Sequence, residues 1–134
     1  MLRLLDANAN RALEGLRVCE DIARLQLESP REFRRLRRLR HAVAEAVNAL
    51  PVSLMELLEA RDSSADVGRR AAGSSVDSVG RLLLINFQRT KEALRTLEEC
   101  TRLLAPSRTT MFQRLRFHTY GIERDLLLAT LRHS

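Results

Sequence analysis

The sequence predicts an all-α protein, a four-helix bundle in which a helix pair is repeated with internal pseudo-twofold symmetry. Leucine, alanine, arginine and glutamate dominate the chain and are good helix formers, and only five glycines and three prolines interrupt them. A polar pattern, N-x-x-R-x-x-E-[GA]-L-R-x-x-E-[DE]-x-x-R-L, occurs at residues 8–25 and again 78 positions later, at 86–103. A shorter echo relates residues 33–37 (FRRLR) to 112–116 (FQRLR). Two helix pairs of this kind pack most naturally as a four-helix bundle.

The first two helices are delimited by capping signals. Asp6 is a suitable N-cap for a first helix of roughly 22 residues. A second helix is expected to begin at Ser29, with Pro30 at its first position and Glu32 completing a capping box, and to end near Leu50.

A short helix and a long loop follow. Ser53 and Glu56 form a second capping box, which opens one or two helical turns as far as Ala60. Residues 61–75 have no helical period and contain two glycines, so they are predicted to be the long loop of the protein.

The third helix is expected from near Asp77 to just before Pro106, and the fourth from Ser107 to the C-terminus. The organisation predicted is one helical domain, residues 1–134, with repeat halves of about 6–50 and 77–132 joined by a linker and loop at 51–76.

The charge balance favours anionic partners. The chain has 23 basic and 17 acidic residues, a net charge of +6, and all but one of its basic residues are arginine. Arginine holds phosphate groups with a planar fork of donors. Candidate partners on this basis are nucleic acid, acidic protein surfaces and phosphorylated small molecules, although a biased genome composition would also explain the arginines.

Two classes of partner are not expected. No stretch approaches the roughly 18–20 apolar residues of a membrane span, and no signal peptide precedes the repeat, so the predicted location is cytoplasmic with no membrane partner. Nucleic acid is not expected as a partner, because the six arginines at 31–40 share their helix with apolar residues at amphipathic spacing, which is typical of a solvated face. The aromatic residues or recognition motif of a nucleic-acid reader are not evident.

The repeat conserves polar rather than apolar residues. Six of its eight identical positions are polar, whereas a repeat kept for packing should share its apolar period. On a helix, Glu20 and Glu98 lie inside the apolar stripe, where an unpaired carboxylate is costly. The pattern therefore indicates either a functional site built from two halves or a buried ion-pair network that fixes helix register.

The other polar residues of the repeat lie either at the edge of the apolar stripe of their helix or on its solvated face. Asn8 and Arg11 lie along one edge, as do Asn86 and Arg89 in the second copy. These four residues and the two glutamates are predicted to meet in one pocket beside the loop. Two series have the spacing of ordinary pairs on a solvated helix face, namely Glu14–Arg17–Asp21 and Glu92–Arg95–Glu99.

The segment at 61–68 offers oxygen ligands. Asp62 and Asp66 accompany two serines, an arginine and a glycine. Such groups suit Mg²⁺, which usually takes one or two carboxylates and leaves its other positions to water and phosphate. The alternative is a polar connector in which the aspartates cap turns. A Walker A motif is absent, since no glycine is followed by Lys-Ser or Lys-Thr.

Three long motifs resemble one known family. They are LLDANANRALEGLRVCEDIARL at 4–25, ARDSSADVG at 60–68 and INFQRTKEALRTLEE at 85–99, followed by RFHTYGIE at 116–123 where the family has an RYxxYxLE-like segment. Together they are similar to the small all-helical hydroxymethylpyrimidine phosphate kinases of thiamin biosynthesis, which are often fused to thiamin-phosphate synthase. The chain departs from the family pattern at Ile85, where alanine is usual.

The resemblance implies ATP-dependent phosphorylation of 4-amino-5-hydroxymethyl-2-methylpyrimidine phosphate to the diphosphate, with ATP and Mg²⁺. Without a glycine-rich loop, arginines must hold the phosphates. The candidates are Arg11, Arg89 and Arg61 for phosphates, and Asn8 and Asn86 for the aminopyrimidine. Mg²⁺ binding and orientation of the attacking group fall to Glu20 and Glu98 or to Asp62 and Asp66, with the glutamates assigned to catalysis and the aspartates to the metal.

A rival hypothesis belongs to a different class. The chain would then be a non-catalytic helical partner or regulatory module of thiamin-phosphate synthase, because the family is often fused to that enzyme. The sequence leaves the oligomeric state open, with a homodimer as one alternative.

Overall fold

A computed structural model describes residues 1–69, 73 and 75–132, and every regular element within these residues is helical. The all-α prediction is therefore confirmed. The long helices are α1 (Leu2–Asp21), α2 (Pro30–Asn48), α4 (Val79–Leu104) and α5 (Thr109–Arg132). The short α3 (Leu54–Ala60) follows α2. Residues 70–72 and 74 of the expected loop, and the last two residues, lie outside the described part of the chain.

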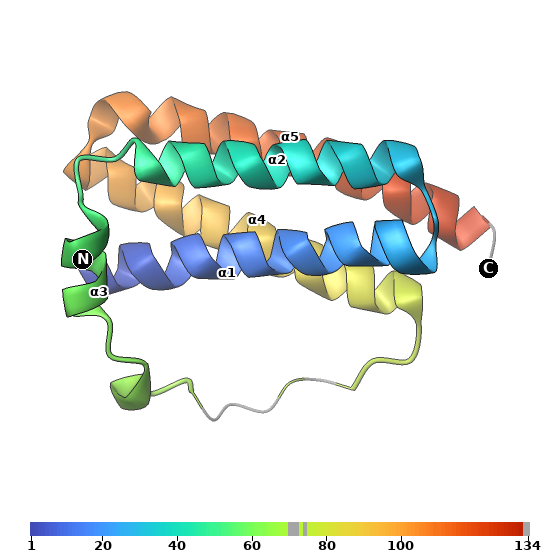
Figure 1. Ribbon diagram of the computed structural model, residues 1–134, viewed down its shortest axis with the longest axis horizontal. Helices are drawn as coiled ribbons and strands as arrows, with labels where there is room; N and C mark the ends of the chain where they lie inside the picture. The colour runs from blue at the N-terminus through green and yellow to red at the C-terminus, as the bar shows by residue number, and fades with distance from the viewer. Residues whose placement is uncertain (70–72, 74, 133–134) are drawn as a thin grey trace.

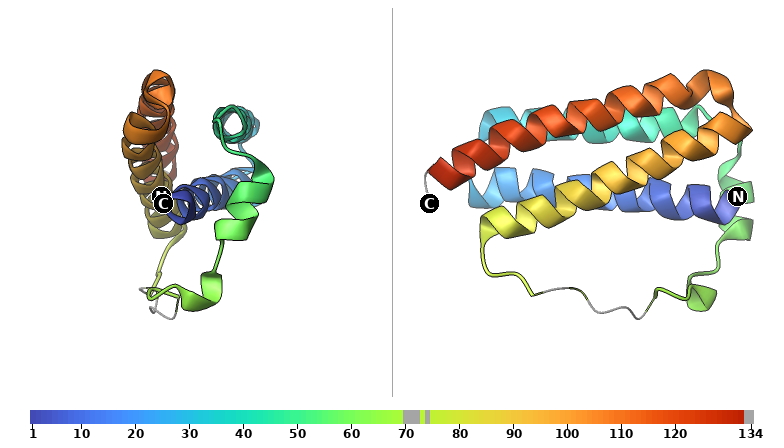
Figure 2. Two further views of the ribbon diagram at one scale, coloured as in Figure 1. Left: turned by 90° about the vertical axis from the view of Figure 1, so that its left-hand side faces the viewer. Right: turned by 180° about the vertical axis from the view of Figure 1, so that it is seen from behind.

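The four long helices form a bundle. α2 and α5 lie along one side and α1 and α4 along the other, while residues 61–69, which follow α3, lie on the α1–α4 side (Figure 1, Figure 2). α1 makes its most extensive contacts with α4, so the two copies of the repeated motif face each other.

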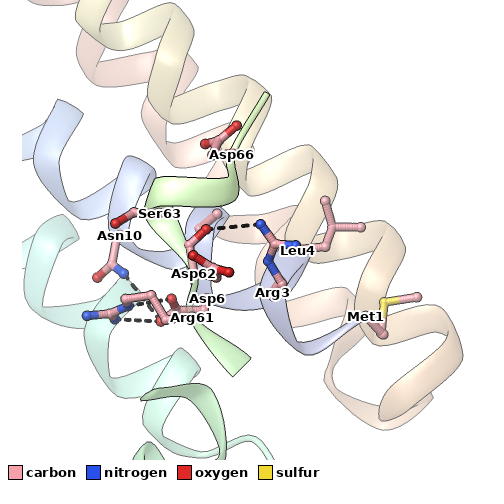
Figure 3. Close-up of a pocket in the computed structure, with 10 residues that line it drawn as sticks. Met1, Arg3, Leu4, Asp6, Asn10, Arg61, Asp62, Ser63 and Asp66 are labelled. Carbon is pink, nitrogen blue, oxygen red and sulfur yellow. Dashed lines mark hydrogen bonds and ion pairs between the residues drawn. The ribbon is translucent and has the colours of Figure 1, made fainter. Parts of the chain in front are cut away.

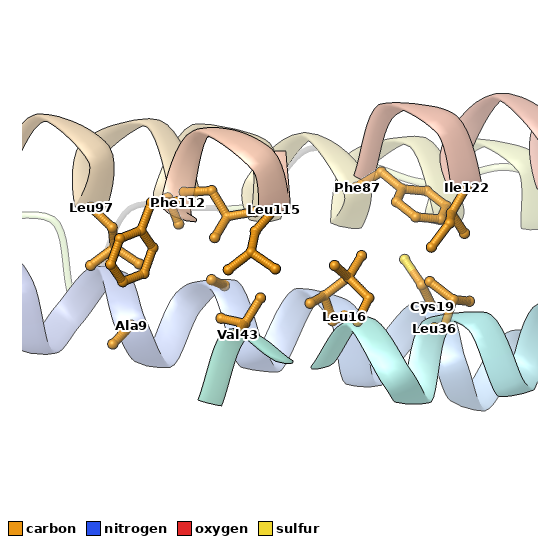
Figure 4. Packing of buried hydrophobic residues seen from close by; sticks show 14 of the residues in the cluster. Ala9, Leu16, Cys19, Leu36, Val43, Phe87, Leu97, Phe112, Leu115 and Ile122 are labelled. Atoms are coloured by element: carbon orange, nitrogen blue, oxygen red, sulfur yellow. The ribbon is translucent and has the colours of Figure 1, made fainter. Parts of the chain in front are cut away.

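A continuous core joins the two helix pairs. Leu16 of α1, Leu36 of α2, Phe87 of α4 and Phe112 of α5 are all completely buried (Figure 4). Burying such side chains stabilises the fold by about 1.5–3 kcal/mol each. Among the described residues, none of the helices is both long enough and apolar enough to cross a membrane.

The first helix begins earlier than the sequence predicted. α1 starts at Leu2, so Asp6 lies in its second turn and is not the N-cap. Leu2 and Leu5 continue the helical apolar period upstream of Asp6, and the Asp6 carboxylate pairs instead with Arg61. The Asp6 carboxylate, which the sequence predicted to cap the helix, therefore binds the distant Arg61 side chain instead.

Of the two predicted capping boxes, the one at Ser53 is confirmed and the one at Ser29 is wrong. Ser53 and Glu56 form the expected capping box of α3. Pro30 begins α2 as expected, but Ser29 makes no side-chain cap and Glu32 is buried against Arg35, with a 3.0 Å ion pair. An ion pair within α2 has replaced the local cap at this position, and Arg35 extends it to Asp125 of α5 at 2.9 Å.

The other helix boundaries lie close to the predicted positions. α1 continues into a π-helical segment, Ile22–Gln26, so helical structure ends near the predicted boundary. Ser78, one residue beyond the predicted start, caps α4 by accepting a hydrogen bond from the Arg81 backbone. A 3₁₀ turn at Pro106–Arg108 precedes α5.

Candidate functional site

The two repeat helices approach each other closely at a glycine. A Cβ atom added to Gly15 would lie 2.9 Å from the backbone oxygen of Asn86 and closer still to the hydroxyl of Thr90. That hydroxyl donates a 3.3 Å hydrogen bond to the backbone oxygen of Ala12. The absence of a side chain at Gly15 therefore lets the α1 and α4 backbones come together at this crossing.

A groove of about 670 Å³ opens over this crossing. α1 contributes Arg11 and Glu14, and α4 contributes their repeat counterparts Arg89 and Glu92. The other lining residues include Asn86 of α4 and, from the segment after α3, Asp66 and Gly68. Two pairs of repeat counterparts, Arg11 with Arg89 and Glu14 with Glu92, thus line the groove, which is flanked by one irregular segment.

The charged groups of the groove lack partners. Arg11, Glu14, Arg89 and Glu92 are exposed, and none of their side chains makes a hydrogen bond or ion pair with another described residue. Exposed charges of this kind contribute little to stability. Two unpaired guanidinium groups facing one groove are well suited to bind a ligand that carries phosphate groups.

The sequence did not predict that Glu14 and Glu92 belong to the groove. Their spacing suggested surface pairs with Arg17 and Arg95, but Arg17 pairs with Asp21 at 3.2 Å and Arg95 with the glutamates at 98 and 99. Glu14 and Glu92 face the groove instead. The available signal was their identity in both copies of the repeat.

The two asparagines shared by the repeats occupy equivalent positions in their helices. Each is buried and donates a 2.9 Å hydrogen bond to the carbonyl four residues before it, Asn8 to Leu4 and Asn86 to Leu82. Only Asn86 lines the groove. The structure therefore gives the two asparagines the same local geometry but brings just one of them to the site.

The buried glutamates lie elsewhere, in ion pairs within each helix pair. Glu20, 3% exposed, accepts two hydrogen bonds from the Arg40 guanidinium of α2. Glu98, 5% exposed, accepts one from Arg116 of α5 at 3.1 Å. Neither glutamate lines the groove, so the predicted meeting of all six residues does not occur. Their geometry is that of the ion-pair network considered as the alternative.

A second cavity, of about 550 Å³, adjoins the groove and shares three lining residues with it, Ala7, Asn10 and Asp66. Its floor is the ion pair of Asp6 and Arg61, with two hydrogen bonds of 2.7 Å (Figure 3). These bonds lower the pKa of the Asp6 carboxyl, and the Asn10 amide adds a further donor. Arg61 thus ties the irregular segment to α1.

The two aspartates proposed as metal ligands differ in their engagement. Asp62 Oδ1 accepts hydrogen bonds from the Ser64 hydroxyl at 2.9 Å and the Ala65 backbone at 3.2 Å, and these bonds lower the pKa of the Asp62 carboxyl. Asp66 accepts one, from the Gly68 backbone at 2.8 Å. Only Asp66 lines both the cavity and the groove. Asp62 is chiefly a turn cap, which is the connector role considered as the alternative.

The fit of the site to Mg²⁺ depends on the carboxylate of Asp66. Within the described residues, no three histidine, cysteine or carboxylate side chains cluster closely enough to hold a metal by themselves. Mg²⁺ usually takes one or two carboxylates and leaves its other positions to water and phosphate. Asp66 at the junction of the two hollows fits that pattern, since its carboxylate is exposed and accepts just one hydrogen bond.

Residues 3–125 match the ThiD2 family. Among curated proteins, the chain is 38% identical over 128 residues to a thiamine-phosphate synthase of Synechocystis sp., covering 93% of this chain and 36% of that protein. Thiamine-phosphate synthases of Nostoc punctiforme and Rhodopirellula baltica are each 34% identical, over 93% and 96% of this chain. The chain spans about a third of the length of these relatives. No solved structure matches it.

Proposed function

The chain belongs to the ThiD2 family, and from this membership and the geometry of the groove we propose that it acts in thiamin biosynthesis as a kinase. The reaction proposed is ATP-dependent phosphorylation of 4-amino-5-hydroxymethyl-2-methylpyrimidine phosphate to the diphosphate. The family match covers most of the chain and carries the three motifs that resemble this kinase family.

One observation supports the proposal above all others. Arg11 and Arg89 are repeat counterparts, line one groove and have no partner among the described residues. Two phosphorylated substrates need two anion sites at a short distance from each other, and a pair of free guanidinium groups supplies them.

The proposed transfer needs charge neutralisation more than acid–base chemistry. The bond between the γ-phosphorus of ATP and its bridging oxygen breaks, and ADP leaves with that electron pair. A new bond forms between the γ-phosphorus and a phosphate oxygen of the pyrimidine substrate. That oxygen is already deprotonated at neutral pH, so no base has to remove a proton, and the total charge of substrates and products is equal. Arg11 and Arg89 would screen the repulsion between the phosphates.

The remaining residues would act around this pair. Asp66 would contribute a carboxylate to Mg²⁺, which supplies further neutralisation of the phosphates. Arg61, held by Asp6, would orient the segment that carries Asp66 rather than clamp a phosphate by itself. Asn86 reaches the groove and would contact a substrate, whereas Asn8, Glu20 and Glu98 would support the helices behind it.

A second candidate function is favoured by the relatives. They are named thiamine-phosphate synthases and are about three times as long as the matched region. The chain would then be a non-catalytic partner or regulatory module of such an enzyme. In that case the protein alone would not hydrolyse or transfer phosphate from ATP, whichever groove residue is replaced.

The deciding experiment measures ADP formation from the purified protein with ATP, Mg²⁺ and the pyrimidine phosphate, and identifies the diphosphate product by mass spectrometry. We expect stoichiometric ADP and pyrimidine diphosphate, with no ADP when the pyrimidine phosphate is omitted. Absence of both products, with a folded protein, would reject the kinase and favour the partner module.

A further inference from the structure

A third hollow, of about 410 Å³, lies between α4 and α5 and reaches the edge of the groove. It is lined by Gln88, Lys91, Glu92, Arg95, Arg116 and Tyr120. Glu92 lines this hollow and the groove alike, so the two spaces meet at its side chain. The groove therefore adjoins two further hollows: the cavity beside α3, which shares Ala7, Asn10 and Asp66 with it, and this α4–α5 chamber, which shares Glu92.

The two repeats differ in chemistry at the α4–α5 chamber. The counterpart of Gln88 is Asn10, and the counterpart of Lys91 is Leu13. Asn10 is engaged, since its amide donates to Asp6 at 3.3 Å. The Gln88 side chain is exposed and makes no hydrogen bond with any described residue. A free amide at the chamber wall is thus particular to the second half.

The aromatic wall of the chamber is held in place by a buried cluster. The Lys91 ammonium lies 4.4 Å from the centroid of the Tyr120 ring and pairs with Glu123 at 2.7 Å. In the first half the counterparts of Tyr120 and Glu123 are His41 and Ala44. Glu123 is 7% exposed, and its Oε2 atom has no hydrogen-bond partner in the described chain. Such an oxygen is costly, so the cluster is not optimised for stability alone.

From these features we infer that the α4–α5 chamber binds the aminopyrimidine ring of the phosphate acceptor, with Gln88 and Tyr120 as its recognition residues. The inference rests on the proposed function. A 4-aminopyrimidine presents an amino donor beside a ring-nitrogen acceptor, and a primary amide presents the complementary acceptor and donor. Gln88 offers this pair, and Tyr120 offers an aromatic surface for the ring.

The same chemistry exists in adenine, so the relative size of the two chambers matters. The cavity beside α3 is larger, about 550 Å³ against about 410 Å³. It suits the bulkier nucleoside, which leaves the smaller chamber for the single pyrimidine ring. Both rings would then project away from a shared phosphate groove, with the two phosphate groups meeting between Arg11 and Arg89.

The test uses Gln88→Leu and Tyr120→Leu, each assayed for KM with both substrates and for pyrimidine phosphate binding by calorimetry. We expect KM and Kd for the pyrimidine phosphate to rise about tenfold, the effect of losing one or two hydrogen bonds or a ring contact, while KM for ATP stays within about twofold. His41→Leu is the matched control, since His41 is the exposed counterpart of Tyr120 and lines none of the three hollows.

Each outcome separates the inference from the kinase itself. A rise in KM for ATP alone would assign the chamber to the nucleotide and overturn the inference, as would unchanged constants in both variants. A wild-type protein that forms no ADP, but whose binding of the pyrimidine phosphate weakens on Gln88→Leu, would retain the chamber and reject the kinase.

Discussion

The charged residues of the groove and those of the buried ion pairs belong to the same repeated motif. The charged motif residues in the groove have no partner among the described residues, whereas the buried ones are paired. Arg11 and Arg89 face the space between the two halves and pair with no described residue. Glu20 and Glu98 face the second helix of their own half and pair with arginines there. A charged residue of the motif therefore lacks a partner where it faces the groove between the two repeat helices, and it is paired where it faces the second helix of its own half.

This difference separates stability from binding. Removing one member of a buried pair leaves an uncompensated charge in a region with little water. Removing an exposed, unpaired charge leaves the folded state almost unchanged, but it takes away a contact that a ligand would make. Substitutions in the two regions should therefore affect different measurements, and four predictions test that contrast.

The largest effect is expected at the buried glutamates. Glu20→Ala and Glu98→Ala should each lower the free energy of unfolding by about 3 kcal/mol, because each strands a largely buried arginine. Urea denaturation followed by circular dichroism measures the change.

Matched controls are available from the groove. Glu14→Ala and Glu92→Ala remove exposed glutamates that have no partner among the described residues, so their stability should change by no more than about 0.5 kcal/mol. Equal destabilisation by Glu14→Ala and Glu20→Ala would remove the distinction between the two regions.

The next effect concerns turnover. Arg11→Ala and Arg89→Ala should each reduce kcat/KM by roughly tenfold to a hundredfold, since a charge-assisted contact contributes about 1.5–3 kcal/mol. Their stability should stay within about 0.5 kcal/mol of the wild type, as neither guanidinium is paired.

Arg38→Ala serves as the control for arginine removal. Arg38 is exposed on α2, a helix that contributes nothing to the groove, so turnover should remain nearly intact. Folded Arg11→Ala and Arg89→Ala variants with wild-type turnover would refute the phosphate-clamp role.

Much of the fold was predictable because its signals are local or repeated. The capping box at Ser53 and the stop at Pro106 depend on neighbouring residues, and the sequence located both. The all-α class followed from composition and from the repeat. The burial of Glu20 and Glu98 was also predicted, since helical periodicity fixes which face each side chain occupies.

The partners of these side chains were not predictable in the same way. Asp6 reaches Arg61 across 55 positions of sequence, and Glu20 reaches Arg40 on another helix. Periodicity specifies the face of a helix but not which residue lies opposite it. For this reason the sequence placed Glu20 in the site, and it read Glu14 as part of a surface pair.

A smaller effect is expected for the two aspartates after α3. Asp66→Asn should raise the Mg²⁺ concentration for half-maximal activity by about tenfold, the loss of roughly one charge-assisted contact. Asp62→Asn should shift it much less, because Asp62 Oδ1 already accepts two hydrogen bonds within its turn. Binding of Mn²⁺ with ADP, followed by electron paramagnetic resonance, measures the same difference without turnover. A larger shift for Asp62→Asn than for Asp66→Asn would reverse the assignment.

The smallest effect should come from the ion pair of Asp6 and Arg61, which has no equivalent in the second half because the counterpart of Asp6 is Leu84. Hydrogen bonds from Arg61 lower the pKa of Asp6 in the folded protein. The pair therefore adds stability above the ordinary pKa of an aspartate, about 3.9, and this contribution is lost as the pH falls through the lower folded pKa. Asp6→Asn should lower Tm by a few degrees at pH 7, a modest change since the Arg61 side chain is 43% exposed and screened by solvent. The Tm difference from wild type should begin to narrow as the pH drops below about 4, where the carboxyl of the unfolded chain takes up a proton, and it should disappear below the lowered pKa of the folded protein. A difference that stays constant from pH 7 to pH 3 would show that the substitution acts through packing in α1 and not through the charge of Asp6.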